Sequence, residues 1–381
     1  MIDLVCTCPA GLSELLLEEL REFGLEAATA GDSAVILPAC GYERIPWLNH
    51  WSTLSERVGI LLDRGSFAGA ADLRRRVESL QLPAWIHGDL TFAVAGERRG
   101  CHDFTSPQLA ALVGGGLNQV WQKTLGHPLR ADLRDPDLSF HVQVQDADYL
   151  LFLDTSGARL SRRYSLPFQH YAPLNPVLAA AMVRLSGFRR HGQLIDPMCG
   201  GGTILIEAAM LAVGLAPATW SEGPRGWERH PWSGQRPAAP LPPPPRWSGP
   251  APRLTGADRY GGKIGGLRAN WAHLGLPDLR SVVGSAFNLN WMEPGEAAPL
   301  AVLNPPYGIR VSRPYEVDAL YEGFARAAAH KGIGEIVAIS PRRGPWAGCL
   351  RKNGYEVNTI LPVANAGLHC FLMRAVLPGV S

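Results

Sequence analysis

Two short stretches of the chain have residue types and spacing that suit group-transfer chemistry. The first is Asp196-Pro-Met-Cys-Gly-Gly-Gly-Thr203, where an acidic residue precedes three glycines. The second is Asn304-Pro-Pro-Tyr307. Glycine lets a backbone approach a ligand closely and adopt positive φ angles, whereas consecutive prolines stiffen a turn and remove backbone donors. We therefore expect a ligand-binding turn at the first stretch and a rigid turn that presents polar acceptors at the second.

The second stretch suggests which atom is modified. The Asn304 side-chain oxygen and the Pro305 carbonyl can together accept both protons of a planar amine. Such a nitrogen is a poor nucleophile, and two acceptors would aim its lone pair and stabilise the positive charge that develops on it. Pro306 extends the rigid turn, and the Tyr307 ring offers a face on which a base can stack. We predict that Asn304, Pro305, Pro306 and Tyr307 are catalytic; the alternative is a turn with a packing residue.

The glycine stretch suggests which cofactor is used. It does not match a phosphate-binding loop, because no lysine follows the glycines, and it does not match G-x-G-x-x-G. An acidic residue before the glycines suits a cofactor with an ammonium group or hydroxyls, which points to S-adenosylmethionine (AdoMet). Asp258, at the end of the next predicted strand, can accept both hydroxyls of a ribose. The alternative is that Asp258 caps a helix.

The elements that must position these residues follow two patterns. Before residue 164 the chain reads as α+β: a segment over residues 1–53 and a second unit over residues 54–163. Residues 164–190 form a linker and a helix. Over residues 191–381, apolar strands alternate with helices, which predicts a doubly wound, mainly parallel α/β sheet. Buried strands are expected at residues 192–196, 253–258, 281–284, 300–303 and 335–339, and helices at residues 176–185 and 203–213.

A proline-rich insert at residues 231–252 interrupts this second pattern, with four consecutive prolines at residues 242–245. Proline excludes both a helix and a central strand. We expect a surface loop of polyproline II type. A ligand for SH3-like partners is the alternative.

Composition excludes several classes of protein. The chain has 381 residues, of which 46% are hydrophobic and 18% charged, so it is not a disordered chain. Its apolar runs are too short to span a membrane, and the N-terminus lacks signal-peptide features, so we expect a cytoplasmic protein. The seven cysteines are odd in number and include no C-x-x-C pair, which argues against a disulfide framework or a structural zinc site; we expect no metal. A net charge of +2 does not by itself predict a nucleic-acid partner.

Taken together, the two motifs resemble the THUMP-containing RNA guanine-N2 methyltransferases that act on tRNA and 23S rRNA. The similarity extends over nearly the whole chain. The segment from Cys8-Pro-Ala-Gly11 resembles the ferredoxin-like start of that family, residues 130–144 and 153–157 resemble the second half of THUMP, and residues 171–182 resemble the approach to the methyltransferase domain. The resemblance implies a Rossmann-like AdoMet methyltransferase domain preceded by a ferredoxin-like and THUMP module.

The resemblance also implies a set of cofactor contacts. The expected AdoMet-binding residues are Leu174, Asn175, Pro176, Asp196, Pro197, Met198, Cys199, Gly200, Gly201, Gly202, Thr203, Asp258, Ser285, Ala286 and Asn304. Two of them depart from the family pattern: Gly201 replaces a serine, and Ser285 stands where the family has an aspartate for the adenine amine. A hydroxyl can still accept that hydrogen bond, less strongly than a carboxylate.

The THUMP module implies an RNA partner. Arg159, Arg162, Arg163 and Tyr164 follow it, and arginine with aromatic residues suits single-stranded RNA; a solvated linker is the alternative. We predict methyl transfer from AdoMet to the exocyclic N2 of a guanosine in tRNA or 23S rRNA. Transfer to adenine N6 or cytosine N4, and a non-catalytic RNA-binding or ribosome-assembly factor, remain alternatives. We expect no DNA or membrane partner, and a monomer.

Overall fold

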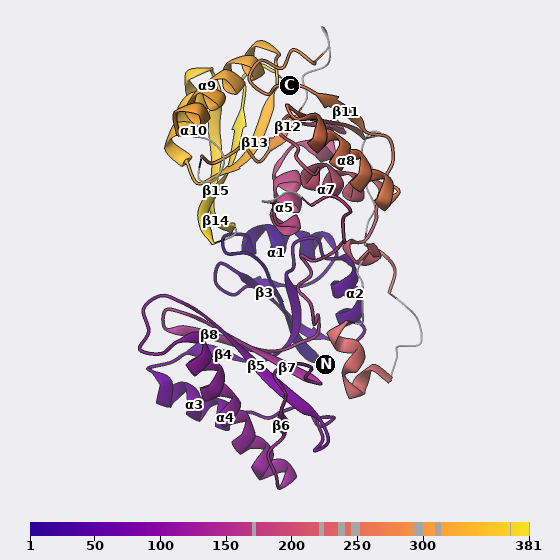
Figure 1. Ribbon diagram of the computed structural model, residues 1–381. Helices are drawn as coiled ribbons and strands as arrows, with labels where there is room; N and C mark the ends of the chain where they lie inside the picture. The colour runs from indigo at the N-terminus through magenta and orange to yellow at the C-terminus, as the bar shows by residue number, and fades with distance from the viewer. Residues whose placement is uncertain are drawn as a thin grey trace.

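A computed structural model shows two lobes stacked end to end (Figure 1). It describes residues 1–169, 173–220, 225–234, 241–244, 252–292, 300–308, 314–365 and 367–380. Residues 1–154 form the lower lobe in that view, with the N-terminus inside it, and residues from 176 onward form the helices and strands of the upper lobe.

The lower lobe is built on one eight-stranded sheet in the order β2-β3-β1-β4-β8-β7-β5-β6. Its strands are β1 (Ile2–Thr7), β2 (Ala28–Thr29), β3 (Ala34–Cys40), β4 (Arg57–Ser66), β5 (Thr91–Arg99), β6 (Arg130–Ala131), β7 (Leu138–Gln145) and β8 (Asp148–Asp154). The two units predicted on either side of residue 53 share this sheet, because β1 pairs with β4 through Leu4 and Ile60. The N-terminal segment therefore cannot hinge freely against the unit that follows it.

Four helices belong to the lower lobe: α1 (Ser13–Glu22), α2 (Arg44–Trp51), α3 (Ala70–Glu78) and α4 (Ser106–Leu125). The sequence specifies the start of α4, where Thr105 and Gln108 form a reciprocal capping box and Pro107 lies in the first turn. Phe92 and Val94 of β5 face α4. Side chains alternate between the two faces along a strand, so the odd-numbered residues Glu97 and Arg99 of β5 point to the opposite face of the sheet.

The upper lobe contains a seven-stranded sheet in the order β11-β10-β9-β12-β13-β15-β14. The strands are β9 (Gln193–Asp196), β10 (Arg253–Asp258), β11 (Arg280–Val283), β12 (Leu300–Leu303), β13 (Glu335–Ser340), β14 (Glu356–Asn365) and β15 (Leu368–Val376). The first five run parallel, and β15 runs antiparallel to both β13 and β14. Strand β11 was expected to be buried but forms an edge of the sheet, where Val283 is 58% exposed.

Helices cover both faces of this sheet. Helices α5 (Pro176–Leu185), α7 (Thr203–Val213) and α8 (Gly261–Leu274) pack in one apolar core, with the short α6 (Phe188–His191) before β9. Helices α9 (Pro314–His330) and α10 (Arg343–Lys352) pack in a second core. Residues in β9 and β12 alternate between the two cores, which confirms the doubly wound arrangement. Among the described residues, no helix is long and apolar enough to cross a membrane.

The connection between α7 and β10, residues 214–252, returns to the lower lobe. It contains the short helices η1 (Pro217–Trp220), η2 (Gly226–Arg229) and η3 (Pro231–Gly234). Trp232 packs on Tyr42 with ring centres 5.0 Å apart, and the Trp47 indole N–H donates to the Pro242 carbonyl at 2.7 Å. The described part of the proline-rich insert is thus held against α2 rather than lying free; Pro245 falls outside the described residues.

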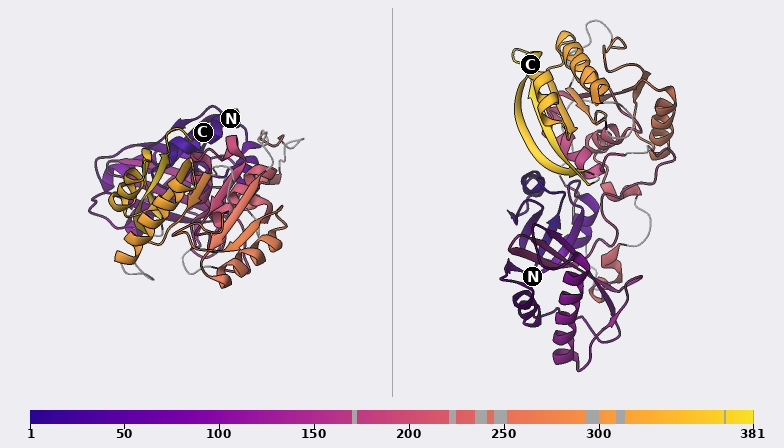
Figure 2. Two further views of the ribbon diagram at one scale, coloured as in Figure 1. Left: turned by 90° about the horizontal axis from the view of Figure 1, so that it is seen from above. Right: turned by 60° about the vertical axis from the view of Figure 1, so that its left-hand side comes forward.

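The two lobes also meet at the β14–β15 hairpin, whose lower end reaches the region of α1 (Figures 1 and 2). Gly11, which precedes α1, has φ +87°. A Cβ atom at this position would collide with the Pro362 carbonyl of β14. Only glycine permits this conformation and this close approach together.

Candidate functional site

Three neighbouring strands of the upper sheet end in the polar residues that the sequence singles out. In the order β10-β9-β12, Asp258 ends β10, Asp196 ends β9, and Asn304 follows β12. The strands are parallel and in register, with Ile195 opposite both Thr255 and Ala301. Their carboxyl ends therefore meet at one edge, and strand order reverses at β9, where doubly wound folds bind their ligands.

The glycine turn between β9 and α7 has the backbone that its sequence predicts. Gly200 and Gly202 have φ of 53° and 89°. Gly202 also lies so close to α8 that a Cβ atom would collide with Leu267. Gly201 has no such φ, and its carbonyl accepts a hydrogen bond from Asn270 of α8 at 2.9 Å. Two of the three glycines are therefore required by the backbone.

Asp196 and Asp258 place two buried carboxylates beside this turn. Asp196 is 2% exposed and accepts a hydrogen bond from the Met198 N–H at 3.1 Å. Burial, with a smaller contribution from the charge of Asp258, raises the pKa of Asp196 to about 8. A cation bound beside Asp196 would favour its ionised form.

The Asp258 carboxylate accepts hydrogen bonds from two backbone segments. One oxygen accepts from the Tyr260 N–H, at the start of α8, at 3.1 Å. The other lies 3.3 Å from the Gly200 nitrogen, which donates to it, and 3.4 Å from Lys263 Nζ. Asp258 thus ties the residue before α8 to the glycine turn, and its carboxylate lone pairs can accept further hydrogen bonds, while its contact with a ribose stays a prediction.

The other predicted cofactor residues border the same strand ends or the start of α5. Pro197, Met198 and Cys199 lie in the glycine turn, and Thr203 begins α7. Ser285, after β11, is half-buried, and its hydroxyl accepts from the Phe287 N–H at 3.2 Å; Ala286 beside it is buried. Leu174 is buried, Asn175 caps α5 by accepting from the Val177 N–H at 2.9 Å, and Pro176 begins α5.

The Asn304-Pro-Pro-Tyr307 turn follows β12, and two asparagine side chains hold the Tyr307 hydroxyl. Its hydroxyl donates to the Asn304 side-chain oxygen at 2.8 Å and accepts from the Asn365 amide at 3.2 Å. Burial raises the pKa of Tyr307 well above its usual value. The Pro306 carbonyl accepts from the Tyr321 hydroxyl at 3.1 Å, and Pro305 is buried. No sequence signal pointed to Asn365 or Tyr321.

Two of the four predicted RNA contacts, Arg163 and Tyr164, instead bind a carboxylate of the upper lobe. Arg163 is 1% exposed and donates to Glu207 of α7 at 2.7 Å and to the Thr53 carbonyl. The Tyr164 hydroxyl donates to the same Glu207 carboxylate at 3.1 Å. A guanidinium buried in this way holds the lobes together and is not accessible to RNA, which corrects the prediction for Arg163; the contact of Tyr164 with RNA stays a prediction. Arg162 is exposed.

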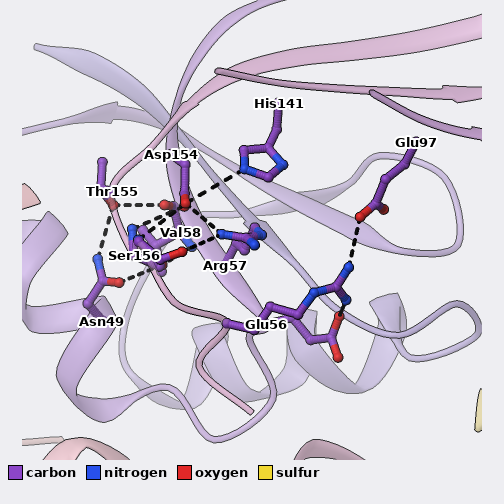
Figure 3. Close-up of polar contacts among 11 residues, drawn as sticks. Asn49, Glu56, Arg57, Val58, Glu97, His141, Asp154, Thr155 and Ser156 are labelled. Atoms are coloured by element: carbon purple, nitrogen blue, oxygen red, sulfur yellow. Dashed lines mark hydrogen bonds and ion pairs between the residues drawn. The ribbon is translucent and has the colours of Figure 1, made fainter. Parts of the chain in front are cut away.

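Arg159 remains at the surface, where it lies between two acidic side chains of the lower lobe, Glu56 and Glu97, which Figure 3 labels. It forms ion pairs with Glu56 at 2.8 Å and Glu97 at 2.9 Å. Glu56 also accepts from the Asn175 amide at 3.0 Å. These contacts link the face of the lower sheet to the start of α5 in the upper lobe.

Close by, a buried polar cluster joins β4, β8 and α2 (Figure 3). Arg57 pairs with Asp154 at 2.6 Å, and His141 lies 3.8 Å from the same carboxylate. Burial raises the pKa of Asp154 to about 6 and lowers that of His141 to about 3. Asn49 donates to Thr155 at 3.0 Å, which fixes α2 to the end of β8.

Two hollows on this face of the lower sheet lead toward the upper lobe. One, of about 380 Å³, is lined by Arg64 and Gln145 among others, and the second, of about 220 Å³, reaches Ala364 and Asn175. Three residues line both: Glu97, Arg99 and Gln143. The two hollows thus form one polar groove, which runs from the lower sheet to Ala364, the hairpin residue next to Asn365.

Comparison with known families and proteins supports each lobe. Models for an RlmL ferredoxin-like domain, a THUMP domain and an RMKL-like methyltransferase domain match residues 3–59, 68–154 and 162–369. The resemblance seen in the sequence, and with it the fold class, is therefore confirmed.

Two curated relatives match most of the chain. A tRNA (guanine(6)-N2)-methyltransferase from Methanocaldococcus jannaschii is 27% identical over 96% of this chain and 98% of its own length. The ribosomal RNA large subunit methyltransferase K/L from Ectopseudomonas mendocina is 31% identical over 93% of this chain, which spans about half (50%) of that relative's length.

Solved structures share the whole fold. TrmN from Thermus thermophilus has a TM-score of 0.68 at 23% identity, covering 99% of this chain and 100% of its own. SMU.472 complexed with SAH has a TM-score of 0.77 at 20% identity, covering 98% of this chain and 97% of its own. With the family model spanning more than half of its residues, the chain belongs to the RMKL-like methyltransferase domain family and carries a THUMP domain and an RlmL ferredoxin-like domain before it.

Proposed function

We propose that this protein is an AdoMet-dependent RNA methyltransferase that methylates the exocyclic N2 of a guanosine in tRNA or 23S rRNA. One observation carries the proposal: Asp196, Asp258 and Asn304 end three adjacent parallel strands around a glycine turn. The names of the relatives, a tRNA guanine-N2 and a large-subunit rRNA methyltransferase, support the choice of substrate.

The residues at these strand ends fit AdoMet. The buried Asp196 carboxylate, whose pKa is raised, would be stabilised by a cationic group, and AdoMet carries an ammonium and a sulfonium. Asp258 retains acceptor capacity for ribose hydroxyls, and Ser285 can accept from an amine. When bound, AdoMet supplies an activated methyl group attached to the sulfonium. Support also comes from the shared fold of SMU.472, which was solved with SAH.

The Asn304 side-chain oxygen and the Pro305 carbonyl would hold the protons of the target amine. Both acceptors sit on a turn stiffened by two prolines, so little reorganisation is needed as positive charge develops on the nitrogen. After transfer the positively charged nitrogen is acidic, and it releases one proton to water. The chain's contribution is therefore positioning and electrostatic stabilisation.

The groove on the lower sheet supports RNA as the substrate. Arg99 and Arg159 line it and can contact phosphates, while Gln143 can contact bases. The groove ends at Ala364, beside the residue that contacts Tyr307. A base inside a duplex could not reach Asn304, so the target would be single-stranded or flipped out.

The test is methyl transfer to unmodified tRNA and 23S rRNA, with the products digested and their nucleosides identified by mass spectrometry. We expect N2-methylguanosine. Asn304→Ala should slow single-turnover transfer by about 10²–10³, comparable to losing one preorganised transition-state contact, with AdoMet affinity unchanged. The matched control is Asn353→Ala, which removes a side-chain amide that donates to the Cys349 carbonyl. Methylated adenine or cytosine, or full turnover by folded Asn304→Ala, would refute the proposal.

A further inference from the structure

The Tyr307 hydroxyl lies between two asparagine side chains that come from distant parts of the upper lobe. Asn304 follows β12, and Asn365 is the last residue of β14. The hydroxyl receives a hydrogen bond from the Asn365 amide at 3.2 Å and donates one to the Asn304 oxygen at 2.8 Å. Asn365 is 7% exposed, so water does not easily replace it as a donor.

The direction of these two bonds fixes the Asn304 amide. An amide NH2 only donates, so the single hydroxyl proton of Tyr307 points away from Asn365, and the Asn304 oxygen at 2.8 Å accepts it in preference to the weakly accepting sulfur of Cys370 nearby. The Asn304 oxygen, rather than its nitrogen, is therefore the atom turned to Tyr307. An amide oxygen has two lone pairs, and one remains for a substrate amine. A hydrogen bond from Tyr307 also polarises the Asn304 carbonyl within a chain of bonds.

Asn365 sits where the two lobes touch. Its hairpin rests on the lower lobe through the close contact between Pro362 and Gly11. The adjacent Ala364 lines the groove with Arg159 and Asn175. A shift of the hairpin relative to the lower lobe would therefore move the Asn365 amide that supports Tyr307.

We propose that Asn365 is a positioning residue for methyl transfer: it acts through the Tyr307 hydroxyl to hold the Asn304 oxygen in its accepting orientation, from a hairpin braced by the RNA-binding lobe. This inference rests on the proposed function of Asn304. It changes the role expected for Tyr307, whose hydroxyl now matters as well as its ring.

Three variants test the inference: Tyr307→Phe, Asn365→Leu and the double variant. Tyr307→Phe keeps the ring and removes the bond to Asn304, so single-turnover transfer should slow about tenfold, the effect of losing one hydrogen bond. Asn365→Leu keeps the side-chain size and removes the anchor, so it should slow transfer about threefold to tenfold on the same basis. The double variant should be no slower than Tyr307→Phe, because Asn365 acts only through Tyr307.

Affinity for AdoMet should stay within about twofold of the wild-type value in all three variants, since each of them keeps Asn304, the expected AdoMet contact to which Tyr307 bonds. Asn353→Leu, at the end of α10, is the control for the general effect of losing an asparagine and should keep the wild-type rate. A structural role alone would lower the melting temperature and AdoMet affinity along with the rate.

Wild-type rates in Tyr307→Phe or Asn365→Leu would overturn the inference and leave the proposed function standing. Additive losses in the double variant would also overturn it, because they would mean that the two residues act independently. A wild-type protein that methylates no RNA would overturn both proposals, so the two failures are distinguishable.

Discussion

Replacing Asp196 by Asn should stabilise the cofactor-free protein at alkaline pH while removing its affinity for AdoMet. The carboxylate is 2% exposed, and its pKa rises from 3.8 to about 8 because burial disfavours its charged form. Asparagine has the same shape and can still accept the hydrogen bond from Met198. The substitution therefore removes the buried charge with little change in packing.

The sign and size of the effect follow from linkage. Because the pKa is raised on folding, the native state binds the proton more tightly than the unfolded state. The associated stability is complete below pH 3.8 and is lost as pH rises through about 8. A shift of about four units corresponds to roughly 6 kcal/mol at pH 9. Between pH 7 and pH 9 the wild-type protein should lose about 1 kcal/mol relative to Asp196→Asn.

This difference is measured by unfolding both cofactor-free proteins in urea at several pH values between 6 and 9. The control is Asp278→Asn, which replaces an exposed carboxylate. Calorimetry with AdoMet in two buffers of different ionisation enthalpy should show that the wild-type protein releases a proton on binding at pH 7, because a cation favours ionised Asp196. Parallel stability curves for the two proteins, or wild-type AdoMet affinity in Asp196→Asn, would refute this reasoning.

Three further substitutions test other parts of the structure. Gly202→Ala, which combines a φ of 89° with a collision against Leu267, should lower the free energy of unfolding by about 2–4 kcal/mol and weaken AdoMet binding in a titration. Arg163→Met leaves Glu207 buried without its cation and should lower the free energy of unfolding, measured in urea, by about 3–5 kcal/mol. Combining Arg163→Met with Glu207→Gln removes the unpaired charge and should recover part of that loss. Trp47→Phe removes the bond to the Pro242 carbonyl, at a cost of about 1 kcal/mol, and limited proteolysis should then cut faster near residue 242; an unchanged cleavage rate would contradict the contact.

The sequence predicted the catalytic lobe well where local pattern decides structure. Helices α5 and α7 and strands β10 and β12 have the residues expected, because apolar periodicity, proline at the first helical position and glycine turns act over a few neighbouring residues. The glycine turn was predictable for the same reason. Its two positive φ angles are encoded by the residue type itself.

What the sequence could not predict depends on partners far along the chain. Arg163 follows a polar segment and looks exposed, yet it is buried by Glu207, 44 residues later. Asn365 supports Tyr307 across 58 residues, through a hairpin that was not predicted. Ion pairs and antiparallel edges of this kind are set by tertiary packing, for which local periodicity carries no signal. All of the assigned cofactor contacts, Ser285 and Ala286 included, stay predictions.

The connection between α7 and β10 has a consequence for how the protein is made. The Trp47 indole cannot form its hydrogen bond until Pro242, which is 195 residues later in the chain, has been synthesised. At translation rates of about 5–20 residues per second, the interval is roughly 10–40 s. During that time the lower lobe can fold on the ribosome with the aromatic side chains around α2 uncovered. The nascent lower lobe therefore exposes an aromatic surface that a chaperone can bind until the connection emerges from the ribosome. The two lobes can form this contact only after most of the first βα unit of the catalytic sheet has been synthesised.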